Sequence, residues 1–199
     1  KSVSPQNNIP RLVFISSTSV YGPRHGGWVD ADTPIDPAVL DEDARTLLET
    51  ERLVLADTAE KRVEGMVLRL SGIYGPGRSR ADALRSGRVK AEPSEAFTNR
   101  IHRDDAVAAI VRLLEKGAAG QVYLATDDFP VTQTEFYGWL CSRLGIDFPP
   151  TRVPGAGVGT VHGVDLAAAS KRCSNAKLKK LGWAPRFPGY KEGYGALLA

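Results

Sequence analysis

The sequence predicts an α/β fold: a parallel sheet with a small mixed α/β subdomain beside it, within one domain. Three short apolar runs, at residues 11–16, 65–70 and 121–125, have the composition of strands buried on both faces. A helical pattern over residues 41–62 separates the first two runs, and a second separates the last two. Strands that alternate with helices form parallel sheets with right-handed crossovers. At 199 residues, the chain is long enough for one sizeable core.

The first helix is predicted over residues 41–62. Acidic residues begin this segment, where they interact favourably with the helix dipole. Apolar residues recur along it at helical spacing: Ala44, Leu47, Leu48, Val54, Leu55 and Ala59. Before this helix, residues 21–37 are rich in Gly, Pro and Asp and predict a long loop. Long loops in compact domains are often functional.

A second helix is predicted over residues 104–116, with Gly117 as a left-handed stop. Its apolar residues are expected to bury one side of the helix: Ala106, Val107, Ile110, Val111, Leu113 and Leu114. A short helix over residues 81–86 and extended pieces around Val89 and residues 97–101 are expected before it.

The C-terminal third is predicted to be mainly helical. The pattern Thr-Gln-Thr-Glu at residues 132–135 matches a capping box and begins a helix that should end at Gly145. Residues 147–163 are rich in Pro and Gly, which predicts a loop or lid. A capped amphipathic helix is expected over residues 174–183, and a final helix over residues 190–198.

Composition and charge exclude several classes of protein. Lys and Arg number 26 against 23 Asp and Glu, and the scattered basic residues favour a solvated surface over a nucleic-acid patch. No stretch approaches the roughly 18 apolar residues of a membrane span. His25, His102 and His162 lack metal-ligand spacing, and Cys141 lies far from Cys173. We therefore expect a cytoplasmic protein that binds no nucleic acid, membrane or metal.

Three segments carry a resemblance to a known family. Residues 12–22 read LVFISSTSVYG and pass from an apolar strand into a hydroxyl cluster. Residues 67–77 read VLRLSGIYGPG, and residues 174–185 read SNAKLKKLGWAP. Together these segments resemble the extended short-chain dehydrogenases/reductases, the NAD-dependent epimerase/dehydratase family. The likeness runs from Arg11 to the end of the chain.

The resemblance implies a Rossmann-like sheet. Its core portion would comprise residues 9–75 and 100–130, and residues 76–99 and 131–199 would belong mainly to the substrate-side subdomain. The family begins with a glycine-rich turn that binds the cofactor pyrophosphate. The present sequence lacks that turn, so we interpret residues 1–199 as the C-terminal portion of such a domain.

The resemblance also implies an NAD or NADP cofactor for the full-length protein, with weak or absent binding by this portion alone. The cofactor-side positions are Ser16, Ser17, Leu70, Ser71, Gly72 and Ile73. Four glycines, Gly155, Gly157, Gly159 and Gly163, do not complete a dinucleotide fingerprint, because no strand precedes them and the third required position is not glycine.

On the family pattern, Ser17 takes the place of the catalytic Ser or Thr, with Tyr21 a weaker candidate. The tyrosine and lysine that normally transfer the proton are replaced by Asp43 and Leu47. Leu47 carries no charge that could lower the pKa of a neighbouring group, so the standard proton relay is absent. Ser17 has an equally plain alternative role, which is to cap the loop backbone.

The substrate-side positions implied by the resemblance are Tyr21, His25, Tyr74, Arg100 and His102. Each has a structural alternative: Tyr21 as a packing aromatic, His25 as an exposed loop residue, and His102 as a helix-start residue. Gly72 stands where many sugar-nucleotide members carry Asn, and Thr98 stands where they carry an Arg that binds the diphosphate. A sugar-nucleotide substrate is therefore not favoured.

The leading hypothesis is an atypical extended short-chain dehydrogenase/reductase, an NAD(P)-binding oxidoreductase or epimerase-like protein of unassigned substrate. The alternatives are a non-catalytic binding or sensor module that keeps the cofactor cleft, or an inactive truncated fragment. The expected partners are an unknown small-molecule substrate and a second copy of the chain, because a sheet edge and its apolar faces would be exposed.

Overall fold

The core of the protein is a three-stranded parallel sheet. In spatial order, the strands are β1 (Arg11–Ser17), β3 (Glu64–Leu70) and β7 (Val122–Ala125). The structure, a computed structural model, describes residues 9–148, 160–161 and 164–199. Ser17 pairs with Leu70, which pairs in turn with Ala125, so the carboxyl ends of the three strands lie side by side. The predicted parallel sheet is confirmed, but β1 is not buried on both faces, because Leu12 and Ile15 are about 40% exposed at the edge of the sheet.

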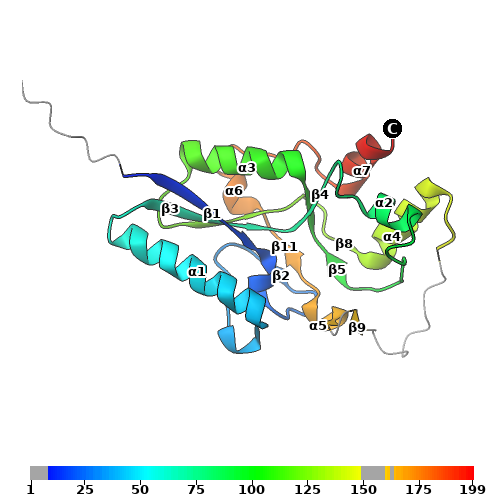
Figure 1. Cartoon of the computed structure of the whole chain (residues 1–199), viewed down its shortest axis with the longest axis horizontal. Helices are drawn as coiled ribbons and strands as arrows, with labels where there is room; N and C mark the ends of the chain where they lie inside the picture. The colour runs from blue at the N-terminus through cyan, green and yellow to red at the C-terminus, as the bar shows by residue number, and fades with distance from the viewer. Residues whose placement is uncertain (1–8, 149–159, 162–163) are drawn as a thin grey trace, which may run out of the picture.

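Helices cover both faces of this sheet (Figure 1). Helix α1 (Glu42–Ala59) contacts β1 and β3 on one face, and α3 (Arg103–Lys116) contacts the same strands on the other. Helix α1 begins after Asp41, whose carboxylate accepts a hydrogen bond of 2.8 Å from the backbone N–H of Ala44. The predicted packing of a long helix across the sheet is therefore confirmed.

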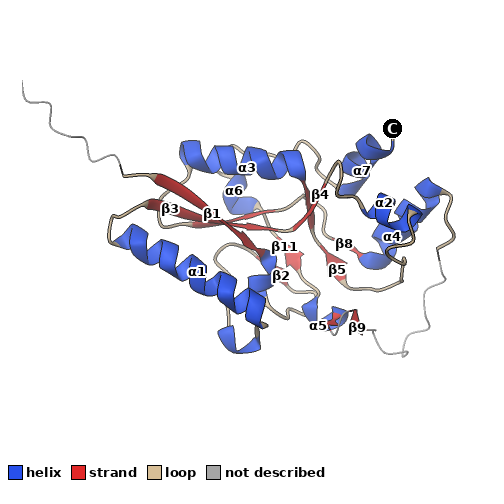
Figure 2. Ribbon diagram, in the orientation of Figure 1, coloured by secondary structure: helices blue, strands red, loops and turns tan. Residues whose placement is uncertain are grey.

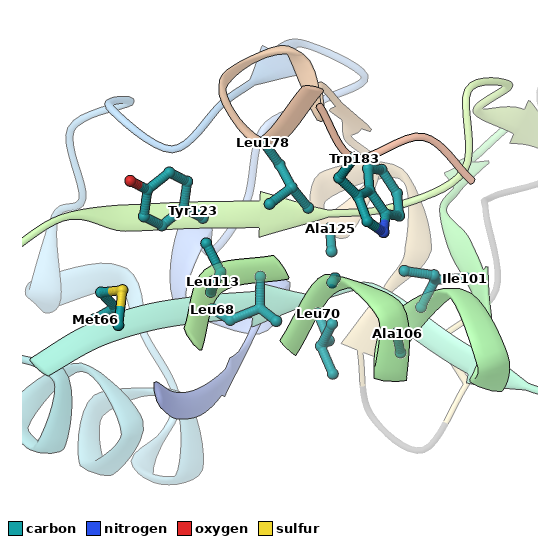
Figure 3. Close-up of a cluster of buried hydrophobic side chains, with 11 residues drawn as sticks. Met66, Leu68, Leu70, Ile101, Ala106, Leu113, Tyr123, Ala125, Leu178 and Trp183 are labelled. Atoms are coloured by element: carbon teal, nitrogen blue, oxygen red, sulfur yellow. The ribbon is translucent and has the colours of Figure 1, made fainter. Parts of the chain in front are cut away.

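The main hydrophobic core lies between the sheet, α3 and the segment that follows β11 (Arg172–Cys173). Figure 3 labels ten of its residues: Met66, Leu68, Leu70, Ile101, Ala106, Leu113, Tyr123, Ala125, Leu178 and Trp183. Each large aliphatic or aromatic side chain buried here contributes about 1.5–3 kcal/mol. This core holds the carboxyl ends of β3 and β7 in place.

Two expectations for α3 are wrong. Val107, Val111 and Leu114 are 54, 47 and 41% exposed, because the face toward the sheet is set instead by Ala106, Ala109 and Leu113. Gly117 is not left-handed but extended, with φ −66° and ψ 144°. Glycine is needed there for close approach, since a β-carbon would lie 2.7 Å from the carbonyl oxygen of Leu113.

A buried ion pair ties α1 to β3. The guanidinium of Arg69 donates to both carboxylate oxygens of Glu51, at 3.0 and 2.7 Å. It also donates to the hydroxyl of Tyr21 at 3.2 Å, and that hydroxyl donates to the carbonyl of Asp30 at 2.6 Å. Such a bidentate pair is geometrically specific, and removing one partner would leave the other charge buried.

The smaller subdomain gathers at one end of the molecule (Figure 2). Its strands are β4 (Gly72–Tyr74) with β6 (Arg100–His102), paired in parallel, and β5 (Phe97–Thr98) with β8 (Val131–Thr132), paired antiparallel. Its helices are α2 (Arg80–Arg85), α4 (Gln133–Leu144) and α7 (Tyr190–Leu198). No strand forms around Val89, which lies in an irregular segment after α2.

Helix α4 has the predicted ends. The side chain of Thr132 accepts a hydrogen bond from the backbone N–H of Glu135 at 3.1 Å. Gly145 is left-handed, with φ 65°, and its N–H donates to the carbonyl of Cys141. The buried side of the helix, with Phe136, packs toward α7.

The predicted helix over residues 174–183 is shorter than expected. Only α6 (Ala176–Lys179) forms, and Asn175 makes no side-chain cap. The amide of Asn175 instead donates to the carbonyl of Thr126 at 2.9 Å and to the carboxylate of Asp128 at 2.7 Å. This tail therefore anchors the segment after β7.

The remaining elements are short connections. They are η1 (Thr18–Tyr21), η2 (Pro37–Val39), β2 (Trp28–Val29), which pairs with β11, β9 (Thr160–Val161), β10 (Val164–Asp165) and α5 (Leu166–Ala169). Most of the predicted loop over residues 147–163 lies outside the described residues. Within the described part of the chain, no helix is long and apolar enough to cross a membrane.

Candidate functional site

Three serines lie where the strands of the sheet end. Ser16 and Ser17 close β1, and Ser71 directly follows β3. The backbone N–H of Ser71 donates to the carbonyl of Ala125 at 3.2 Å, which holds this edge together. In open α/β sheets, ligands bind outside the carboxyl ends of the strands. The serines therefore stand at the position in the fold where a ligand is expected.

Ser17 caps the short helix η1. Its hydroxyl oxygen accepts a hydrogen bond of 3.1 Å from the backbone N–H of Ser19. The hydroxyl hydrogen is not used in this contact, and Ser17 is only half-buried. A hydroxyl can accept and donate at the same time. Ser17 is therefore able to cap the turn and still donate to a ligand.

Ser16 and Ser71 have buried hydroxyl groups without a hydrogen-bond partner among the described residues. Their side chains are 4 and 5% exposed, respectively. Buried polar groups in native proteins are usually paired, so an unpaired one calls for an explanation. Two such hydroxyls therefore lie at the ends of neighbouring strands with their hydrogen-bonding capacity unused among the described residues.

Tyr21 does not face this edge. Its side chain is fully buried, and its hydroxyl bonds to both Asp30 and Arg69. Burial raises the pKa of the Tyr21 hydroxyl to about 12, although Arg69 opposes the rise. Beneath it, Leu47 packs against the same apolar cluster, while Asp43 is exposed at the start of α1. This region presents no amine to Ser17 from the position of the family lysine.

His25 and His102 lie in different surroundings. His25 is exposed and adopts a left-handed backbone with φ 48°. His102 is buried at the start of α3, where its Nδ1 accepts a hydrogen bond of 3.2 Å from the N–H of Asp104. The His102 ring lies 4.2 Å from that of Phe187. These contacts support a structural role for the side chain of His102.

A cavity of about 560 Å³ opens beside the serine edge. It is lined by Gly72 and Ile73 from the predicted cofactor side and by Tyr74 and Arg100 from the predicted substrate side. Ser17 and the other predicted substrate-side residues, Tyr21, His25 and His102, are not part of its lining. The structure thus brings together β4, β6, α2, α4 and α7 around one space.

The deep wall of the cavity contains buried polar groups that are incompletely paired. Arg100 lies flat over the ring of Phe136 at 3.8 Å and donates to the hydroxyl of Thr98 at 2.7 Å. The other terminal nitrogen of Arg100, Nη1, has no partner among the described residues. The Tyr74 ring stacks on Tyr194 at 4.6 Å, and its buried hydroxyl is also unpaired.

Asp127 is the acidic residue that interacts electrostatically with Arg100. Burial raises the pKa of the Asp127 carboxyl to about 8, and Arg100 opposes that rise. Its carboxylate accepts no side-chain hydrogen bond and forms no ion pair within the described residues, although the backbone N–H of Phe129 also opposes the rise in its pKa. Nothing near Asp127 in the sequence predicts this burial.

The mouth of the cavity is formed by arginines that the sequence analysis did not single out. Arg78, Arg80 and Arg88 line it and are exposed. The sequence does contain a sign of this cluster, because four arginines occur close together within residues 78–88. Over the whole chain the basic residues are scattered, so the total charge does not reveal this cluster.

Comparison with known proteins identifies the family. The family model described as NAD dependent epimerase/dehydratase family matches residues 2–125. The chain is 33% identical to a 3-diazoavenalumate denitrifying reductase from a Streptomyces species, covering 83% of this chain and 61% of that protein. It is 34% identical to short-chain dehydrogenase/reductase family 42E member 1 of Bos taurus, covering 75% of this chain and 44% of that protein.

The fold is shared with a solved enzyme. A dTDP-glucose 4,6-dehydratase from Streptomyces venezuelae, solved with NAD bound, aligns with a TM-score of 0.76 at 22% identity. The alignment covers 94% of this chain and 58% of that structure. The chain spans about half to three-fifths of the length of the curated relatives it matches. With its parallel sheet, its serine edge and a family match over residues 2–125, the chain belongs to the NAD-dependent epimerase/dehydratase family.

Proposed function

We propose that this chain forms the nicotinamide and substrate sides of an NAD(P)-dependent oxidoreductase that lacks the usual Tyr-Lys pair. The observations that carry the proposal are the position of Ser16, Ser17 and Ser71 at the ends of β1 and β3, and a cavity whose lining begins at Gly72, directly after Ser71. The substrate is a small molecule that enters this cavity. Membership of the family supports the choice of cofactor.

The residues fit the nicotinamide end of the cofactor. The unpaired hydroxyls of Ser16 and Ser71 are suited to hold its polar groups, and Leu70 and Ile73 provide apolar contacts beside them. When bound, the cofactor supplies or accepts a hydride. The sequence contains no glycine-rich fingerprint for the pyrophosphate, so the 199-residue chain alone binds NAD(P) weakly.

Calorimetric titration of the 199-residue chain with NADH and NADPH tests this part of the proposal. We expect a dissociation constant well above the micromolar range, because only the nicotinamide side contributes contacts. A micromolar constant would contradict the proposed placement of the cofactor.

Ser17 is the proposed hydrogen-bond donor to the substrate. Its hydroxyl oxygen already accepts from Ser19, so its hydrogen is free to stabilise a substrate oxygen that gains negative charge, and solvent supplies the proton that this oxygen takes up. With Leu47 and Asp43 in the places of the lysine and tyrosine, no charged group lowers the pKa of the donor. A well-placed acid or base contributes roughly a hundredfold to ten-thousandfold in rate, so turnover should be slow.

The test compares Ser17→Ala with Ser19→Ala in the whole protein, using NAD(P)H and a panel of carbonyl substrates. Ser17→Ala is expected to lower turnover by roughly one to two orders of magnitude, because the donor is lost. Ser19→Ala is the matched control, since Ser19 is exposed and contributes only backbone groups to η1. Equal turnover in wild type and Ser17→Ala would remove Ser17 from the reaction.

A non-catalytic cofactor-binding module is the second candidate. Its support is the environment of the two replaced positions, since Leu47 is packed in the apolar cluster and Asp43 faces solvent. The double change Asp43→Tyr with Leu47→Lys separates the two candidates. If both wild type and the double variant bind cofactor but transfer no hydride, the binding module is the better description.

A further inference from the structure

The cavity has a strongly one-sided charge. Its lining includes four arginines and no aspartate or glutamate: Arg78, Arg80, Arg88 and Arg100. The rest of the lining is neutral, with an aromatic wall from Phe136, Tyr137 and Tyr194. Clefts lined by charges of one sign concentrate ions of the opposite sign. The lining therefore favours a ligand that carries negative charge.

The arginines at the mouth are not used in ion pairs within the described structure. Arg85, which lies in the same segment but outside the lining, pairs with Asp82 at 3.8 Å. Arg78 and Arg80 form no ion pair with a described acid, and Arg88 donates only to Ser86, at 2.9 Å. Asp82, the acidic residue on α2, thus pairs with Arg85, which lies outside the cavity lining.

Arg100 provides the second and independent observation. It is only 8% exposed, and its guanidinium is held in one orientation by Phe136 and Thr98. Its Nη1 nevertheless has no partner among the described residues, and Asp127 is not within ion-pair distance. Leaving a buried charged donor unpaired is unfavourable. Arg100 lines the cavity, so an anion bound there would offset the cost of burying its charge.

We propose that this cavity recognises an organic anion, with a carboxylate or phosphate group bound by Arg100 and the mouth arginines. The aromatic wall receives a planar apolar body, since rings pack well against Phe136, Tyr137 and Tyr194. Guanidinium groups bind both anions through paired hydrogen bonds. This inference rests on the proposed function in taking the cavity as the substrate site, and it specifies the class of substrate.

Three probes of similar shape test the proposal without any cofactor. Benzoate, phenyl phosphate and the neutral benzamide are titrated into the 199-residue chain, with binding followed by ligand-observed NMR at low salt. We expect at least one anion to bind about tenfold or more tightly than benzamide, and to weaken as salt rises. The tighter of the two anions identifies the group. Equal binding of all three probes would overturn the proposal.

Exposed variants locate the binding without disturbing the core. Arg78→Gln and Arg88→Gln are each expected to weaken the preferred anion about threefold to tenfold, because each removes one charge from the mouth. Arg85→Gln is the matched control, and we expect it to leave the affinity unchanged. An equal loss in Arg85→Gln would show nonspecific attraction to a basic surface and overturn the assignment.

Arg100→Lys tests the deep contact while keeping the charge. It should weaken the anion by about tenfold, since the paired geometry of the guanidinium is lost. Thermal melting of this variant checks that the fold persists.

The experiments distinguish failure of the anion-site proposal from failure of the oxidoreductase proposal. If anions bind as described but the whole protein transfers no hydride, the oxidoreductase proposal fails and the anion site stands. If hydride transfer occurs while benzoate, phenyl phosphate and benzamide bind alike, the reverse holds.

Discussion

Two arginines are buried in the described part of the chain, and they differ in how completely they are paired. Arg69, on the central sheet, donates to both oxygens of Glu51 and to the hydroxyl of Tyr21. Arg100, on β6, has one side-chain acceptor, Thr98, and an Nη1 without a partner among the described residues. Both guanidinium groups also lie over an aromatic ring.

This difference separates structure from function. A charge buried with a full set of partners fixes the position of the elements that carry it. A charged side chain that is buried beside a cavity, with some of its N–H donors unpaired, is prepared to bind a ligand. Its unpaired donors lower the stability of the fold. Changes to the buried polar groups of the sheet should therefore lower the free energy of unfolding. Changes to those near the cavity should leave it unchanged or raise it.

The largest expected effect is at the paired arginine. Glu51→Gln should lower the free energy of unfolding by about 3–5 kcal/mol, because the charge of Arg69 is left buried without its counter-ion. Urea unfolding followed by circular dichroism measures the change. Glu49→Gln is the control on the same helix: Glu49 is exposed, and a change within about 0.5 kcal/mol is expected. Similar losses in both variants would contradict the role of the pair.

Substitution of Asp127, the acidic residue near Arg100, should have the opposite effect on stability. Asp127→Asn is expected to raise the free energy of unfolding at pH 8 by about 2 kcal/mol, since a buried carboxylate no longer has to ionise. Chemical unfolding of both proteins at pH 8 measures this gain. A loss of stability comparable to that of Glu51→Gln would show that Asp127 is paired after all.

The raised pKa of Asp127 also predicts how the stability of the protein changes with pH. Asp127 has its pKa raised from 3.8 to about 8 by burial, so the native state keeps a proton that the unfolded state has released. Its contribution to stability is complete below about pH 4 and is lost as the pH rises toward about 8. Unfolding curves at several pH values should show this decline in wild type and a flatter profile in Asp127→Asn.

The sheet could be predicted because its determinants are local. The apolar runs that form β1, β3 and β7 and the acidic start of α1 are visible in the sequence alone. The exposed face of α3 was not predicted, because its rotation about the axis depends on which residues meet the sheet. The single turn of α6 was not predicted either, since Asn175 bonds to the segment after β7 instead of capping it.

The site was harder to predict than the fold. Family resemblance indicated Tyr74 and Arg100, which the structure places together in one cavity lining. It could not indicate Asp127, whose importance comes from burial, or Arg88, whose importance comes from distant segments that meet around the cavity. The role of Ser17 stays a prediction.

The smallest expected effects come from a pair of tyrosines, one in each region. Tyr21→Phe should lower the free energy of unfolding by about 1–2 kcal/mol, because Arg69 and the carbonyl of Asp30 both lose a hydrogen-bond partner. Tyr74→Phe should leave stability unchanged or slightly raised, since the hydroxyl it removes is buried and unpaired. Both changes keep the ring and its packing, so the hydroxyl alone is tested. Thermal or urea unfolding of the two variants in parallel gives the comparison, and equal losses would mean that Tyr74 has a partner and that the two regions do not differ in the way proposed.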